Sequence, residues 1–302
     1  MAEPELVTIG IPAYNSARFL SATVRSALAQ DYPRIRIVIS VDPSTDGTAD
    51  LAGKLAEALG FEVVLQPRRL GWIANSNAVL NAMDSPFGMI LPHDDLLLPS
   101  YVSRCMAALK ANETAAVACS DLQFIPEGWI TTQLELRGER AARVVRCIED
   151  GFDGVNYRGV IRFDRFARRD VPDAIGGFAG DTLWMLRMAI AGEVIRVPEV
   201  LYQKRLRKHS AHAAWKRMKK RMLDRRWLAH VAEMHLVLLR DAPGLLLDAR
   251  IRRAFSIRAR RLGHAAFINS HPLQGGWTGR FPLAKAHFEH LRYVLGSSHG
   301  YK

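Results

Sequence analysis

Residues 7–15 read VTIGIPAYN, and residues 35–48 read IRIVISVDPSTDGT. Each stretch begins with a run rich in β-branched residues and ends in residues that favour turns, which predicts a strand followed by a loop. An apolar pattern with helical spacing at residues 17–30 separates the two stretches. A strand, a helix and a second strand in this order predict a βαβ crossover with two parallel strands.

The same alternation continues to residue 120 and sets the expected fold class. Further strands are predicted at 61–65, 88–91 and 115–120, and helices at 48–59, 72–83 and 100–110. We therefore expect an α/β fold, a Rossmann-like and mainly parallel sheet with helices on both faces. Beyond residue 121 the pattern is less regular, with a helix at 182–191 and an extended segment at 193–200. Residues 214–239 and 245–267 are predicted to be helical, as is a final segment near 283–295.

Charge is distributed unevenly along the chain. Residues 1–125 hold nine Lys and Arg against thirteen Asp and Glu, whereas residues 203–226 alone hold eleven basic residues against the single acid Asp224. Such a block suits a phosphate-bearing ligand, an anionic membrane or nucleic acid, and a solvated helix face is the simpler alternative. Few aromatic residues accompany the cluster, so we expect no nucleic-acid partner. We predict peripheral contact with anionic lipid through residues 214–270.

Composition excludes several classes of protein. The 302 residues are 49% hydrophobic and 24% charged, which is ordinary for a folded domain, and they contain no apolar run of the roughly 20 residues that a membrane span needs. The three cysteines show neither metal-binding nor disulfide spacing. The acidic first five residues do not look like a secretory signal. We expect a cytoplasmic protein, with peripheral association at the inner face of the membrane as a further expectation.

Polar residues follow three of the predicted strands where ligands bind in open α/β sheets, beyond the carboxyl ends of the strands. The candidates are Pro12, Tyr14 and Asn15 after the first strand, Asp42 after the second, and Asp94 and Asp95 after the fourth. Two adjacent carboxylates suit a hard divalent cation and are costly to bury without one or another cationic partner. The alternative is structural: Asp46 would shape the turn and cap the next helix, and Asp95 would be a turn residue.

In this order the motifs resemble family 2 glycosyltransferases. The resemblance rests on residues 7–15, on the Asp-x-Ser-Thr-Asp-Gly-Thr run from Asp42, on Asn77, and on the acidic pair after the strand at 89–91. It covers about residues 5–125 and implies the GT-A fold. It implies that Pro12, Tyr14, Asn15 and Asp42 hold the nucleotide, typically uracil, with Asn77 beside it. It also implies that Asp94 lies by the ribose or diphosphate and that Asp95 binds Mg²⁺ or Mn²⁺.

The second half is similar to the family in a few elements only. Gly176-Gly177-Phe178 followed by Asp181 matches the family's Gly-Gly-Phe and Glu-Asp elements, and Gly180 stands where the family has Glu. Asp181 would then be the general base, although it also suits the N-cap of the next helix. By the same resemblance, His209 would lie in a basic segment that closes over the diphosphate and would be a metal ligand or a phosphate contact. His212 is the alternative residue for this role. His93 replaces the first Asp of the family's Asp-x-Asp pattern, and Trp184 is either a sugar-stacking platform or a core residue.

These observations predict the reaction and the domain organisation. We expect an inverting transfer of a sugar from a nucleoside-diphosphate sugar, UDP-linked by resemblance, to a hydroxyl of a carbohydrate or lipid-linked acceptor. A carboxylate must accept the proton of that hydroxyl, and a second nucleophilic carboxylate is not identifiable. The alternatives are a nucleotide-sugar-binding protein without activity and a sugar nucleotidyltransferase. We expect a GT-A-like domain at 1–213, with a nucleotide-sugar half at 1–125 and an acceptor half at 126–213, followed by basic helices at 214–302.

Overall fold

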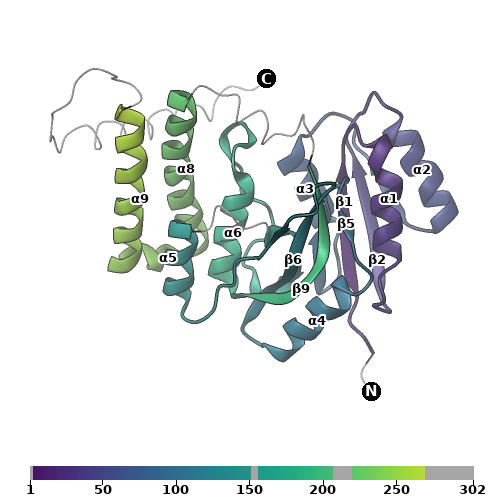
Figure 1. The fold of residues 1–302 in the computed structure, drawn as a ribbon, viewed down its shortest axis with the longest axis horizontal. Helices are drawn as coiled ribbons and strands as arrows, with labels where there is room; N and C mark the ends of the chain where they lie inside the picture. The colour runs from purple at the N-terminus through teal and green to yellow at the C-terminus, as the bar shows by residue number, and fades with distance from the viewer. Residues whose placement is uncertain (1–2, 151–155, 207–219, 269–302) are drawn as a thin grey trace. The chain divides into compact units, whose positions relative to one another are not determined.

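The computed structural model describes residues 3–150, 156–206 and 220–268. The chain divides into two compact units, Met1–Leu206 and Arg207–Lys302, and each is considered by itself. The first unit is a layered α/β structure built on one sheet (Figure 1). The second contributes the helices α8 (Lys220–Asp241) and α9 (Ala249–Ile268), joined by a 3₁₀ turn at Pro243–Leu247. The helix predicted near 283–295 and the predicted site residue His209 lie outside the described residues.

The predicted βαβ alternation is confirmed. The strands are β1 (Val7–Ala13), β2 (Ile35–Val41), β3 (Glu62–Leu65) and β4 (Phe87–Ile90), and the helices between them are α1 (Ala17–Leu28), α2 (Thr48–Leu59) and α3 (Trp72–Asn81). β1 pairs in parallel with β2, from Val7 beside Ile35 to Ala13 beside Val41, and on its other side with β4. The chain order of the strands therefore reverses beside β1, which creates a switch point at the carboxyl edge of the sheet.

The other half of the sheet is mixed. It is formed by β5 (Leu96–Leu97), β6 (Ala115–Ile125), β7 (Ile130–Thr131), β8 (Val160–Arg162) and β9 (Glu193–Arg205). The path through the described sheet is β3-β2-β1-β4-β8-β6-β9-β5, with β7 paired to β6. β6 and β9 run parallel, and β8 runs antiparallel between β4 and β6. The short β8 joins the two parallel groups, and no apolar run in the sequence predicted it.

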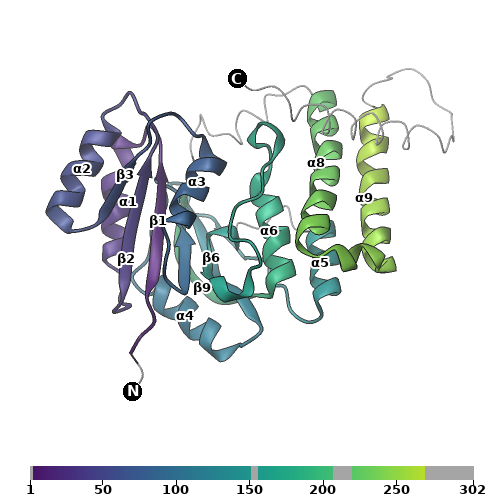
Figure 2. The ribbon, with the colours of Figure 1, turned by 180° about the vertical axis from the view of Figure 1, so that it is seen from behind.

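Helices cover both faces of this sheet, as expected (Figure 2). On one face α1, α2 and α4 (Tyr101–Ala111) pack into a continuous core, to which the strands contribute alternate residues such as Ile9 and Ile11. On the other face, the position of Gly10 lies against Val79 and Met83, beside α3. The acceptor half adds α5 (Arg140–Asp150) and α6 (Gly180–Ala191), whose Trp184 is fully buried and packs on Phe166. Trp184 is therefore a core residue, and sugar stacking by its ring is excluded.

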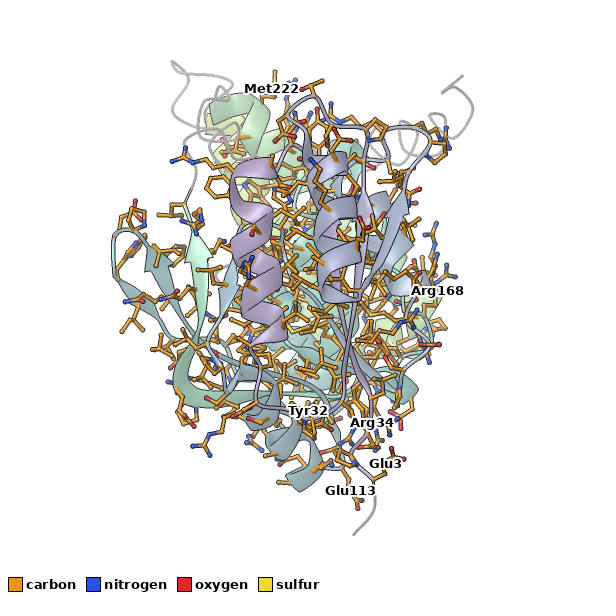
Figure 3. The ribbon with its side chains drawn as sticks, turned by 90° about the vertical axis from the view of Figure 1, so that its right-hand side faces the viewer. Glu3, Tyr32, Arg34, Glu113, Arg168 and Met222 are labelled. Carbon is orange, nitrogen blue, oxygen red and sulfur yellow. The ribbon has the colours of Figure 1, made fainter. Side chains whose placement is uncertain are left out.

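The extended segment before β1 is held at the amino edge of the sheet, opposite the predicted site. Arg34 forms an ion pair of 3.1 Å with Glu3, and the Tyr32 hydroxyl donates to the carbonyl of Glu5 (Figure 3). A surface depression of about 390 Å³ lies at the same edge, between Leu28 and Phe61. Arg36 in its wall is already ion-paired with Asp84 and Glu62, so this depression is distinct in place and chemistry from the acidic pair.

The second unit is a pair of helices with a basic surface. Val231, Met234 and Leu238 are buried on α8, and the His235 ring stacks on Phe255 of α9 at 3.7 Å between centroids. This confirms that helices follow the GT-A-like part, as the sequence predicted. None of the described helices combines the length and the apolarity that a membrane crossing requires.

Candidate functional site

The predicted acidic pair lies directly after β4, in a turn that α1 and the end of β9 hold. Thr23 of α1 donates its hydroxyl to the carbonyl oxygens of His93 and Asp95, at 3.0 and 2.9 Å. The His93 ring contacts the carbonyl of Pro12 through Nδ1, at 3.1 Å, which links the ends of β1 and β4. His93 therefore supports the turn in the place where the family has a carboxylate.

Asp95 is enclosed, and its carboxylate has three partners. The Tyr202 hydroxyl donates to Oδ2 at 2.7 Å, the backbone N–H of Arg205 donates to Oδ1 at 2.9 Å, and Nη1 of Arg158 lies 3.2 Å from Oδ2. Asp95 is 1% exposed and Arg158 9%. Burial raises the pKa of the Asp95 carboxyl, and the adjacent Arg158 cation opposes that rise. The Asp95 side chain thus joins the turn after β4 to β9 and to the 3₁₀ turn Asn156–Arg158, which is more than the structural alternative of a simple turn residue describes.

Asp94 is the more accessible member of the pair, 8% exposed against 1%. Its carbonyl oxygen accepts a hydrogen bond from Nε of Arg205 at 3.1 Å, so the end of β9 holds both members of the pair. Among the described residues, no group of three or more His, Cys, Asp or Glu side chains forms a ready-made metal cage. One or two carboxylates are nevertheless what Mg²⁺ usually takes from a protein when substrate phosphates complete its shell. The donor set therefore fits a divalent ion that binds together with a diphosphate.

Asp181 lies in the first turn of α6, which begins at Gly180 after a left-handed N-cap at Ala179. The alternative that Asp181 is itself the N-cap is therefore wrong. Its side chain is half-buried, and Oδ1 accepts a hydrogen bond from the N–H of Thr182 at 3.1 Å. A carboxylate in this position keeps part of its surface open to a substrate.

Lys204 brings the two halves of the site together. It lies near the end of β9, and its charge interacts with the charges of Arg158, Asp94, Asp95 and Asp181. The repulsion from Arg158, with burial, lowers the pKa of Lys204 to about 8, so the side chain is mostly cationic at neutral pH. Carboxylates after β4 and at the start of α6, far apart in sequence, thus act electrostatically on the same lysine. Arg158 was not among the residues predicted from the sequence, and Lys204 was predicted only as part of the basic block at 203–226.

The nucleotide-pocket candidates are near one another, but several are engaged with the protein itself. Asp42 is 1% exposed and accepts the backbone N–H groups of Leu70 and Gly71, at 3.1 and 2.9 Å. Asn77 forms a paired contact with the backbone of Val171, donating at 3.1 Å and accepting at 2.7 Å. These two side chains therefore order the loop before α3 and attach α3 to the acceptor half.

The loop after β1 carries the partly exposed aromatic ring of Tyr14. The guanidinium of Arg69 lies 4.2 Å from the ring centre of Tyr14, and both side chains are partly or fully exposed. Asn15 adopts a left-handed conformation and accepts the N–H of Thr45 at 2.9 Å, which ties the loops after β1 and β2 together. Asp46 accepts the N–H of Thr48, the first residue of α2, and that of Ala17, so it shapes this turn as the structural interpretation predicted, although the N-cap position itself is Gly47.

An open, mostly parallel sheet with an acidic pair at its carboxyl edge and cations beside it is the arrangement of an α/β protein whose ligand site lies beyond the strand ends. The sequence pattern described as Glycosyl transferase family 2 matches residues 8–195. The chain therefore belongs to this family, and it is a glycosyltransferase.

Related proteins agree with this assignment over shorter segments. Chondroitin synthase of Pasteurella multocida is 32% identical over 124 residues, which are 41% of this chain and 13% of the synthase. An uncharacterised glycosyltransferase of Haemophilus influenzae is 24% identical over 123 residues, 40% of this chain and 38% of that protein. The Escherichia coli UDP-Glc:α-D-GlcNAc-diphosphoundecaprenol β-1,3-glucosyltransferase is 48% identical over 54 residues, 18% of this chain and 22% of that enzyme. The chain thus matches well under half the length of each relative.

Two solved structures are similar along nearly the whole chain. TarS 1–349 of S. aureus in complex with UDP-GlcNAc has a TM-score of 0.62 at 14% identity, covering 96% of this chain and 81% of that one. Mannosyltransferase PcManGT from Pyrobaculum calidifontis in complex with GDP-Man and Mn²⁺ has a TM-score of 0.55 at 18% identity, covering 98% and 82%. At such identities the likeness concerns the fold, which is the GT-A fold.

Proposed function

We propose that this glycosyltransferase moves a sugar from a nucleoside-diphosphate sugar to a hydroxyl acceptor with inversion at the anomeric carbon. The observation that carries the proposal is the acidic pair beyond the end of β4, which Arg158 and Arg205 contact. Asp181 interacts electrostatically with Lys204, as this pair does. UDP is the first candidate for the nucleotide part of the donor, because a solved neighbour holds UDP-GlcNAc and the E. coli relative is named for UDP-Glc. The GDP-Man complex of PcManGT makes GDP the second.

We propose that Asp94 holds the divalent ion and that Asp95 organises the site behind it. The sequence analysis placed the metal on Asp95, but both oxygens of that carboxylate already accept hydrogen bonds and one faces Arg158. Asp94 is the more accessible neighbour. Mg²⁺ or Mn²⁺ bound there would neutralise charge on the leaving diphosphate. Lys204 and Arg205 supply further positive charge beside it.

The proposed general base is Asp181. A sugar hydroxyl is a weak nucleophile near neutral pH, so a carboxylate within hydrogen-bond reach must accept its proton as the new bond forms. Asp181 is half-buried and belongs to the acceptor half, whereas the acidic pair belongs to the nucleotide half. A base on one side and an anion site on the other suit a single displacement, and hence inversion. Tyr14, with Arg69 against its ring, is the proposed surface for the base of the nucleotide.

Release of free nucleoside diphosphate from a panel of nucleotide sugars tests the proposal without knowledge of the acceptor. We expect the wild-type protein to hydrolyse one donor slowly with Mn²⁺ or Mg²⁺ and not with EDTA. Asp94→Asn should reduce that release at least about tenfold, since one charge that stabilises the leaving group through the metal is lost. Asp50→Asn, an exposed position on α2, is the matched control and should retain full activity. Metal-independent release unchanged in Asp94→Asn would contradict the metal role.

For the acceptor we propose a carbohydrate or lipid-linked hydroxyl, with peripheral contact of the basic helices to anionic lipid. Arg225, Arg226, Arg252 and Arg253 lie on the described helices, and each Lys or Arg near such a surface contributes on the order of 1 kcal/mol. We expect the protein to sediment with vesicles that contain phosphatidylglycerol, less so as salt is raised, and not with phosphatidylcholine alone. Equal binding to both kinds of vesicle would contradict this contact.

A further inference from the structure

Trp72 connects the nucleotide half of the site to the loop that carries Asp181. It is the first residue of α3, and its Nε1 donates a hydrogen bond of 3.1 Å to the carbonyl of Gly177. The two residues are 105 positions apart in the sequence. The indole is 41% exposed, so it lies at the surface of the site rather than in the core.

Gly180 is buried directly against this indole. A Cβ atom at position 180 would lie 2.9 Å from Cζ2 and 3.1 Å from Cη2 of Trp72, and 2.9 Å from Cδ1 of Ile73. Real Cβ atoms essentially never approach other atoms below 3.0 Å. The ring of Trp72 is rigid, whereas Cδ1 of Ile73 is the free end of a flexible side chain. A side chain at position 180 would therefore force the indole to shift, at a position where the family resemblance leads us to expect glutamate.

The loop before Asp181 has a backbone that needs external support. Gly176, Gly177 and Ala179 all have positive φ angles, of 62°, 68° and 52°. The left-handed region is sparsely populated by residues with a Cβ, so Ala179 holds this conformation only because its surroundings impose it. The loop's own hydrogen bonds include that from the Thr182 hydroxyl to the carbonyl of Ala179, at 2.7 Å. The bond from Trp72 adds an anchor on a different element, beside the nucleotide half.

We propose that Trp72 is a positioning residue, which holds the loop 176–181 and thereby sets where the carboxylate of Asp181 lies relative to the bound donor. This inference rests on the proposed function, in which Asp181 is the general base. A misplacement of the order of 1 Å between reacting groups can cost about 100-fold in rate, so a contact that fixes the loop acts on turnover more than on donor binding. The role also requires a small residue at 180.

A double-mutant cycle between positions 72 and 180 tests the proposal. The variants are Trp72→Leu, Gly180→Ala and the double variant, with turnover measured as UDP release from UDP-glucose and UDP-GlcNAc in the presence of Mn²⁺. We expect kcat to fall about tenfold or more in each single variant. In the double variant the added methyl group meets no indole, so Gly180→Ala should cost less there than in the wild type. The KM for the donor and the Kd for UDP should stay within about twofold.

Two further variants separate positioning from a general loss of structure. Gly53→Ala places a methyl group on α2, where no atom lies within 4 Å, and should leave kcat unchanged. Trp72→Phe retains a ring and loses the hydrogen bond, so its loss should be smaller, about two- to tenfold. Circular dichroism and urea unfolding establish that each variant folds.

Each result decides the proposal. A kcat within twofold of wild type in Trp72→Leu and Trp72→Phe would overturn the positioning role and leave the proposed function intact. An equal cost of Gly180→Ala in both backgrounds would overturn the steric link. If the wild-type protein neither turns over UDP-linked or GDP-linked sugars nor binds UDP or GDP, the proposed function itself is contradicted, and the positioning role with it.

Discussion

Asp181→Asn should lower the rate of sugar transfer by a factor of about 10²–10⁴ and leave nucleotide binding unchanged. The amide has nearly the shape of the carboxylate but cannot accept the proton of the attacking hydroxyl. Asp181 lies in the first turn of α6, and it is separate from the acidic pair that we assign to the leaving group. The chemical step should therefore fail while the donor still binds.

The measurement combines two readouts on the same preparations. Release of UDP from the active donor gives the rate, and calorimetry with UDP and Mn²⁺ gives the dissociation constant. Asp173→Asn is a matched control, because Asp173 is exposed and lies on the segment that leads to the same loop. A rate within about threefold of wild type in Asp181→Asn would remove Asp181 from the role of base. A loss of UDP binding would instead place it in the nucleotide site.

Arg158→Met should destabilise the protein by about 3–5 kcal/mol, the largest effect on stability that the structure predicts. Arg158 is the buried cation beside Asp95, and its removal takes the ion-pair partner away from a carboxylate in the interior. The hydrogen bonds from Tyr202 and from the backbone of Arg205 would remain, but they do not neutralise the charge. The free energy of unfolding, measured in urea at pH 7, should fall accordingly.

The cause of this effect can be separated from the loss of side-chain packing. In the double variant Asp95→Asn with Arg158→Met no charge is left unpaired, so a substantial part of the stability should return. Arg168→Met breaks a surface pair with Asp170, both partners exposed by more than a third (Figure 3), and should cost no more than about 1 kcal/mol. If Arg158→Met costs no more than Arg168→Met, the buried pair is not a determinant of stability.

The nucleotide half of the fold was predictable because its signals are local. Strands such as Ile35–Val41 are β-branched and bounded by turn residues, and helices such as α1 bury Leu20, Val24 and Ala27 at helical spacing. The position of the acidic pair followed from the rule that ligands bind beyond the carboxyl ends of parallel strands. The acceptor half was not predictable in this way, because β8 is three residues long and pairs only through its neighbours β4 and β6.

The motifs could not predict which residues of the site bind the protein's own backbone and which remain accessible to a ligand. Asp42 and Asn77 match the family pattern, yet their side chains bind backbone groups of Leu70, Gly71 and Val171. Asp94 and Asp95 are neighbours with identical chemistry, and only their surroundings distinguish them. Trp184 and Trp72 have the same side chain, yet one is fully buried and the other 41% exposed. Which functional groups remain open depends on contacts between residues far apart in the chain.

The sequence by itself determined the α/β alternation, the family, and the places where candidate carboxylates follow strands, since these depend on periodicity and on residue order. Only the tertiary structure placed Arg158 against Asp95, held both members of the acidic pair with Arg205, and set Trp72 against Gly180. Burial removes water from such groups, so their ionisation and geometry depend on a few specific partners. Those partners come from distant segments, and folding alone brings them together.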